Sequence, residues 1–186
     1  MTSLKKLIDT EIKIKSIDKD GNVVNETTEH NEIINEGVSV IARLLVDPSG
    51  ARPSHLYARF SGNQTNAQGT SNLGTNNSLV NVLDFLPIDN ASGCLREPIF
   101  STAKVEANGS IIDGKITFFF RITEESELTG SFNASASKIY YLGLAAARDL
   151  SDYNQDMMIS LLEPTTPIEI PTGGQVAIDY TLTLGA

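Results

Sequence analysis

The chain contains two histidines, His30 and His55, and one cysteine, Cys94, which are the side chains best suited to nucleophilic or metal chemistry. Neither histidine belongs to a recognisable metal-ligand spacing, and one cysteine alone forms neither an intramolecular disulfide nor a thiolate zinc site. The sequence also lacks a G-x-S-x-G nucleophile elbow, a phosphate-binding glycine loop and an H-E-x-x-H zinc motif. These patterns predict no catalytic residue, no cofactor-binding residue and no metal ligand.

Two groups of acidic residues offer the remaining chemistry. The loop 149–156 carries Asp149, Asp152 and Asp156, whose oxygens could bind a hard cation such as calcium. Because that spacing matches no defined motif, a solvated acidic loop is the favoured interpretation. A carboxylate pair for acid–base work would need a second carboxylate folded opposite the group formed by Glu124, Glu125 and Glu127.

A third polar group, Asp18, Asp20 and Asn22, resembles the beginning of a calcium loop. Its glycine stands at the fourth place instead of the sixth, however, and no glutamate stands at the twelfth. Aspartate, glycine and asparagine in succession favour a tight turn. We therefore predict a hairpin in which Glu11–Ile17 and Val23–Thr28 pair as strands.

Net charge limits the partners that the chain can bind. The formal charge is −9, and the sequence from Asp149 onward has six acidic residues and no lysine or arginine. Such a surface repels a phosphate backbone, so no nucleic-acid partner is predicted. No apolar run has the length of a signal peptide or the roughly 20 residues of a membrane span. We expect synthesis in a cytoplasm and no membrane partner.

The stretch Lys115–Thr123 (KITFFFRIT) is the clearest predicted strand and the centre of the predicted core. Its even positions, which include Phe118 and Phe120, are apolar, and most of its odd positions are polar. A period of two places one face of a strand in the core and the other outside. Phe119 breaks the alternation, which predicts that the outer face is covered at that point.

One helix is predicted, within about Asn35–Asp47. Val38, Ile41 and Leu44 recur at helical spacing, and Asn35 is a suitable N-cap. The helix should end before Pro48, because the residue preceding a proline is displaced from helical backbone angles. We expect this helix to cover an open end or face of the sheets.

Further strands are predicted over His55–Ser61, Glu97–Ala107, Lys138–Ala147 and Gln175–Leu184. The last alternates most regularly, with its even residues facing inward as far as Leu184. About eight to ten short strands separated by turns imply an antiparallel β-sandwich, jelly-roll-like, with one short amphipathic helix. We predict a single domain over residues 1–186, and its core should include Phe118, Phe120, Ile178 and Tyr180.

The stretch Gly62–Ser78 is a long polar loop without any charged residue. Loops of this length are uncommon in compact domains. Two interpretations stay open: an extended arm that becomes ordered on a neighbouring subunit, and a surface loop.

Three loose motifs follow one another along the chain. They are Asn31–Gly37 (NEIINEG) before the predicted helix, Tyr140–Leu144 (YYLGL) in a strand, and Pro167–Pro171 (PIEIP) before the last strand. Their order resembles that of structural proteins of tailed-bacteriophage virions, the head-decoration, head-fibre and tail-fibre attachment modules. The resemblance implies a β-sandwich without catalysis that assembles into a homo-oligomer and binds other virion proteins.

The leading hypothesis is therefore a non-enzymatic virion structural protein of the head or tail. A carbohydrate-binding β-sandwich module is the alternative. The absence of tryptophan counts against a sugar platform, whereas Tyr57, Tyr140, Tyr141 and Tyr153 keep the alternative open. A small hydrolase with a carboxylate pair is a third hypothesis, which no motif supports.

Overall fold

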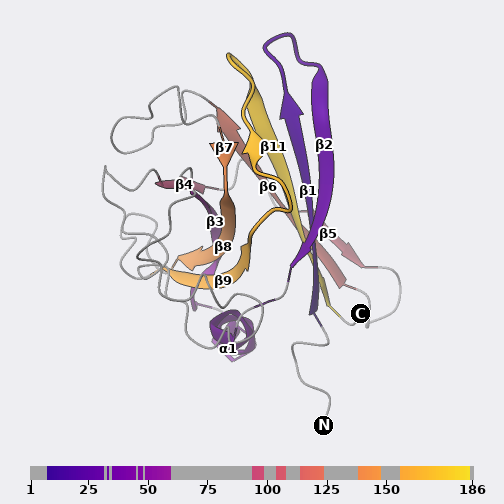
Figure 1. Ribbon diagram of the computed structural model, residues 1–186. Helices are drawn as coiled ribbons and strands as arrows, with labels where there is room; N and C mark the ends of the chain where they lie inside the picture. Colours follow the sequence, from indigo (N-terminus) through magenta and orange to yellow (C-terminus); the bar gives the residue numbers. More distant parts are fainter. Residues whose placement is uncertain are drawn as a thin grey trace.

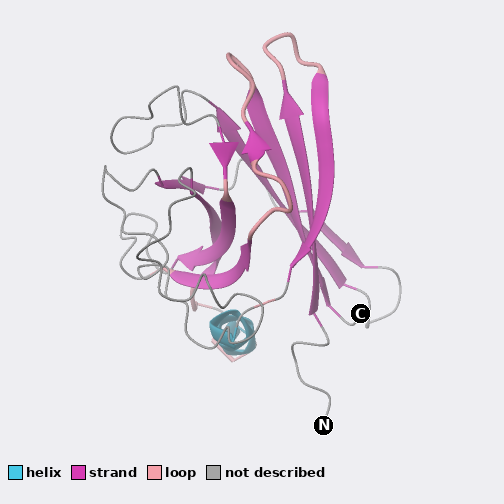
Figure 2. Cartoon of the chain, in the orientation of Figure 1, coloured by secondary structure: helices cyan, strands magenta, loops and turns pink. Residues whose placement is uncertain are grey.

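The structure is a computed structural model that describes residues 8–31, 33, 35–44, 46–47, 49–59, 94–98, 104–107, 114–123, 138–147 and 156–184. This part of the chain is built mainly from strands, with one helix (Figure 2). In chain order the elements are β1 (Ile8–Ile17), β2 (Val23–Asn31), α1 (Asn35–Leu44), β3 (Arg52–Arg59), β4 (Cys94–Pro98), β5 (Lys104–Ala107), β6 (Gly114–Thr123), β7 (Lys138–Ile139), β8 (Tyr141–Ala147), β9 (Met157–Leu162), β10 (Ile168–Glu169) and β11 (Gln175–Leu184).

The larger sheet has five antiparallel strands in the order β2-β1-β11-β6-β5. Its centre is β11, which pairs with β1 on one side and with β6 on the other. The register places Phe120 beside Ile178 and Phe118 beside Tyr180, and all four side chains are buried. The alternation in the sequence therefore predicts the inner face of this sheet correctly.

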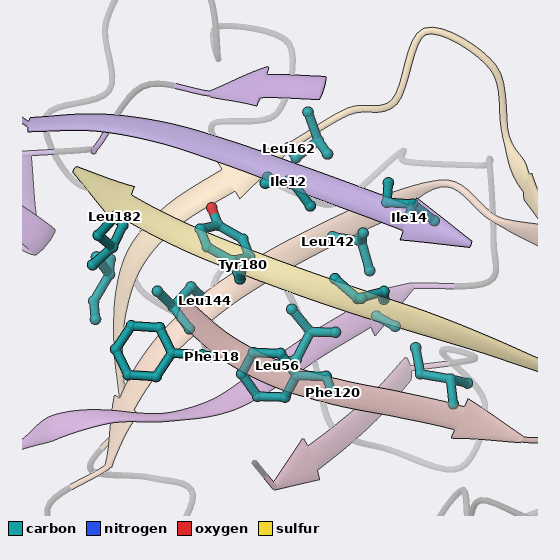
Figure 3. Close-up of a cluster of buried hydrophobic side chains, with 14 of the residues drawn as sticks. Ile12, Ile14, Leu56, Phe118, Phe120, Leu142, Leu144, Leu162, Tyr180 and Leu182 are labelled. Carbon is teal, nitrogen blue, oxygen red and sulfur yellow. The ribbon is translucent and has the colours of Figure 1, made fainter. Parts of the chain in front are cut away.

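A second sheet faces the first in a sandwich-like arrangement (Figure 1). It has four antiparallel strands in the order β4-β3-β8-β9, and a small pair is formed by β10 and β7. Leu56 of β3 and Leu142 and Leu144 of β8 pack with the aromatic side chains of β6 and β11 (Figure 3). The predicted mainly β, antiparallel fold with one short helix is confirmed.

Strands β3, β8 and β9 of the second sheet differ from the strands of the first because side chains on both of their faces are buried. Every described side chain is buried in the runs 55–58, 141–146 and 158–162. Continuous apolar runs are typical of strands that are buried on both faces. The strand expected over His55–Ser61 begins earlier, at Arg52, and buries Tyr57 as well as Leu56.

Three details of the predicted strands were wrong. Glu97–Ala107 is not one strand, because β4 and β5 belong to different sheets. Lys138–Ala147 is interrupted at Tyr140, so that β7 leaves β8 and pairs with β10. Leu184 lies on the same face of β11 as Tyr180 and Leu182 but is not buried: it is 36% exposed at the end of the strand, opposite Gly114, which has no side chain.

Helix α1 packs on β9 and ends at Leu44, slightly before the predicted limit. Val40 is buried, and Val38 and Ile41 are partly buried against the core. The closest approach is at Gly37, where a Cβ atom would overlap the backbone carbonyl of Ile159. The helix can lie this close to the sheet only with glycine at that position.

We expect Gly37→Ala to lower the free energy of unfolding by about 1–3 kcal/mol, because the added methyl group forces α1 away from β9. The matched control is Gly114→Ala, since a Cβ atom there would meet no atom within 4 Å. Urea denaturation followed by circular dichroism measures both variants. Equal stability of the Gly37 and Gly114 variants would contradict the tight helix–sheet contact.

Candidate functional site

The structure does not bring the two histidines together. His30 lies on β2 and is exposed, with Glu11 of β1 opposite it in the register. His55 lies on β3 in the other sheet and is buried, and its Nδ1 atom is 2.9 Å from the Ser54 hydroxyl. A buried imidazole bonded to a neighbouring hydroxyl is a structural arrangement, so neither histidine belongs to a shared site.

Asp156 is the one residue of the acidic loop within the described part of the chain. Its carboxylate is buried and accepts a hydrogen bond of 2.6 Å from the hydroxyl of Tyr57, which is buried too. This bond joins β3 to the start of β9. Asp149, Asp152 and the group Glu124, Glu125 and Glu127 lie outside the described residues. Among the residues that are described, no histidine, cysteine or acidic side chains cluster as metal ligands.

The group at Asp18 forms a turn. The Asp18 carboxylate accepts hydrogen bonds from the backbone N–H of Asn22 at 2.8 Å and of Asp20 at 2.9 Å. These hydrogen bonds lower the pKa of Asp18, and the bond from the Asn22 N–H has the largest effect. Gly21 completes the turn with a φ of 85°, a backbone angle that glycine adopts without strain. The predicted hairpin is confirmed, and its second strand extends beyond Thr28 to Asn31.

A buried polar cluster that the sequence analysis missed connects the two sheets. The hydroxyls of Ser160 on β9 and Tyr180 on β11 are hydrogen-bonded to each other. Thr10 on β1 donates its hydroxyl proton to the Asn31 carbonyl and accepts a bond of 2.9 Å from the Asn31 N–H. Burial raises the pKa of Tyr180 to about 12. A protonated, hydrogen-bonded phenol in the core stabilises the packing of the sheets and has no solvent access for catalysis.

The β1–β2 hairpin forms an exposed end of the described structure. Figure 1 shows this hairpin extending past the four-stranded sheet. Beneath it lies a cavity of about 680 Å³ whose walls include Val24 and Asn25 of β2, Lys138 of β7 and Glu169 of β10. The Lys138 ammonium and the Glu169 carboxylate, both largely exposed, are 2.9 Å apart and form an ion pair in its wall. The lining is apolar as well as polar, with Pro167, Ile170 and Pro171 beside the charged pair.

The described tyrosines do not form an exposed aromatic platform. Tyr57 and Tyr141 are both buried, and each uses its hydroxyl in a hydrogen bond, with Asp156 and Glu163 respectively. Tyr140 is half-buried, and Tyr153 lies outside the described residues. Sugar-binding sites stack sugar rings on exposed aromatic faces. Tyr57 and Tyr141, two of the four tyrosines on which the carbohydrate alternative depends, are therefore not available for stacking.

Among the described residues, no helix is both long and apolar enough to cross a bilayer. Comparisons of the chain with protein-family models, with curated proteins and with solved structures found no match.

Proposed function

We propose that this protein is a non-enzymatic structural component of a tailed-bacteriophage virion, which assembles as a homo-oligomer and binds other virion proteins in the head or tail. It is synthesised in the host cytoplasm and incorporated into the particle. No nucleic acid, membrane or cofactor takes part in this role. Two kinds of observation support the proposal: the motifs that resemble such proteins, and an exposed strand suited to contact between proteins.

The motifs of the resemblance lie in the framework of the fold. Asn31–Gly37 joins β2 to α1 and contains the glycine that packs on β9. Tyr140–Leu144 opens β8, and Pro167–Pro171 contains β10 and precedes the turn into β11. Because these motifs specify packing, they support a kinship in fold, and the contacts with other virion proteins belong to the exposed surface.

The observation that carries the proposal is the exposure of β2. This strand is an edge of the five-stranded sheet, and its residues from Val23 to Thr28 are exposed on both faces. An edge strand presents unpaired N–H and C=O groups that a strand of another chain can bind. Proteins that function by assembly need such surfaces, whereas a single-chain enzyme or sugar-binding module does not.

The test is mass spectrometry of particles purified from the cells that encode this chain, by density-gradient centrifugation. We expect peptides of the chain to co-purify with the major head or tail proteins in a fixed ratio over successive gradients. Abundant cytoplasmic proteins of the host are the control, because they should decrease with each gradient. Decrease of the chain in parallel with those host proteins would overturn the proposal.

The carbohydrate alternative is tested on the same purified protein with a glycan array. Under the proposal, no glycan should be bound in a way that depends on Tyr140, the half-buried tyrosine of the described set. Saturable binding that is lost in Tyr140→Ala would favour the alternative.

A further inference from the structure

The four edges of the two larger described sheets differ in how well they are protected. Two are short strands: β5 has four residues, and β4 has five and ends at Pro98, which has no N–H to offer. The edge of β9 is occupied at Ser160 by a bridge to Ile33. The remaining edge, β2, has nine residues and contains neither lysine nor proline.

Within the part of the chain that the structure describes, β2 is covered by no other element from Val23 to Thr28, and its first contact beyond β1 is at Glu29, whose carboxylate accepts hydrogen bonds from Thr165. Val23 and Val24 are 51% and 58% exposed, and both lie on this edge strand. The pairing of β2 with β1 is regular from Thr10 to Ser16, and the one irregularity is at the hairpin end. Bulges and inward charges are the usual means of blocking an edge. The straight part of β2 has no such bulge, and its one inward charge, Glu29, is held by Thr165 near the end of the strand. The backbone of the strand from Val23 to Thr28 is therefore open to a further strand.

The side chains of β2 are complementary to a second, antiparallel copy of the same strand. When Thr28 lies opposite Thr28 of the second copy, Glu26 of each copy lies opposite His30 of the other. Thr27 then lies opposite Glu29, and Asn25 opposite Asn31. An imidazole donates an N–H to a carboxylate in either protonation state, so both charged pairs are favourable.

Neighbouring registers lack this complementarity. Centring the pair on Glu26 or on Glu29 places two carboxylates directly opposite each other, which is unfavourable. Centring it on Thr27 leaves Val24 opposite His30 and makes no pair of opposite charge. A register shifted by one residue would place the outer face of one sheet on the same side as the inner face of the other. The two cores would then lie on opposite sides of the joined sheet.

We propose that two copies of this protein pair through β2, antiparallel and centred on Thr28, so that their five-stranded sheets become one continuous sheet about a twofold axis. The proposal rests on the homo-oligomer in the proposed function and identifies the surface that forms it. The occupant of the edge is a second copy and no other protein, because the alternation of Glu26, Thr28 and His30 on one face is self-complementary. Within one chain the Glu26 carboxylate oxygen Oε1 is 3.7 Å from the Lys15 ammonium nitrogen Nζ, and this ion pair can persist in the dimer.

The first test uses engineered cysteines in a Cys94→Ser background. Opposite residues of paired strands have Cβ atoms about 4.5–5.5 Å apart, so Thr28→Cys should give a covalent dimer on mild oxidation. Thr27→Cys is the matched control. It lies one position away on the other face, and its partner in the proposed register is Glu29. We expect strong crosslinking of the Thr28 variant and little of the Thr27 variant, by non-reducing electrophoresis.

The second test exchanges the charges and follows the dimer by sedimentation velocity. Glu26→Lys and His30→Glu should each raise the dissociation constant on the order of tenfold. The first removes both carboxylate–imidazole pairs, and the second places two carboxylates opposite each other twice. The double variant should recover most of the affinity. Lys13→Glu is the control, because Lys13 lies on the same face one strand inside the edge and should leave the dimer unchanged.

A dimer that resists both single charge changes, or one that crosslinks through Thr27→Cys better than through Thr28→Cys, would overturn the proposed register. A wild-type chain that stays monomeric at all accessible concentrations would overturn the pairing altogether. Neither outcome decides whether the chain belongs to a virion, because that depends on its co-purification with particles. The failures of the two proposals are therefore distinguishable.

Discussion

Phe120→Ala is expected to lower the free energy of unfolding by about 3–5 kcal/mol, the loss typical of deleting a buried aromatic ring. Phe120 is 2% exposed and pairs with Ile178 in the middle of the five-stranded sheet. Its ring faces the side chains of the second sheet, including Leu56 (Figure 3). Alanine at this position leaves a cavity between the two sheets, and neither sheet can close it without breaking strand pairs.

The matched control is Phe119→Ala, which removes the same ring from the adjacent position. Phe119 points to the other face of β6 and is half-buried, so its loss should cost clearly less. Guanidinium denaturation at constant pH, with circular dichroism to verify the native β-signal, measures both. If the Phe120 variant does not fold, Phe120→Leu provides a smaller cavity in the same place. Equal losses for Phe119 and Phe120 would contradict the assignment of the inner face.

The elements predicted well from the sequence are those whose signal is local. In β6 and β11 one face is buried and the other is not, so apolar residues alternate, and Phe118, Phe120, Ile178 and Tyr180 were predicted as core residues correctly. The turn at Gly21 was predicted for the same reason, because the turn residues are consecutive. In β8 both faces are buried, so apolar residues follow one another without alternation. Such a run does not show which side chains face the other sheet.

The buried polar contacts could not be predicted, because they join distant parts of the chain. Tyr57 and Asp156 are 99 positions apart, and Ser160 and Tyr180 meet only because β9 and β11 belong to facing sheets. A serine within the apolar run MMISLL was the one available signal of a buried partner. The edge position of β2 depends on sheet order in the same way. It follows from the pairing of β1 with β11, near the opposite end of the chain.

Stability in alkaline solution should depend on Tyr180. Burial raises the pKa of this phenol to about 12 in the folded protein, whereas an unfolded tyrosine titrates near 10. The unfolded chain therefore loses its proton first as the pH rises. The contribution of Tyr180 to stability is fully present below pH 10 and is lost between about pH 10 and 12, by roughly 2–3 kcal/mol.

Tyr180→Phe removes the titrating group and should make the stability curve flatter over this pH range. The variant should be less stable than the wild type at pH 8, because the Ser160 hydroxyl loses its phenol partner. Tyr180→Phe combined with Ser160→Ala removes both hydroxyls and should recover part of that loss, which keeps the test possible if the single variant folds poorly.

The control is Tyr140→Phe, which removes a half-buried phenol and leaves the cluster of Ser160 and Tyr180 intact. Urea denaturation at intervals from pH 8 to pH 11 would compare the three variants with the wild type. The wild type and the Tyr140 variant should lose stability in parallel, and both Tyr180 variants should lose less. An equally steep loss in Tyr180→Phe would show that the pKa of Tyr180 does not differ between the folded and the unfolded protein, and would contradict the prediction.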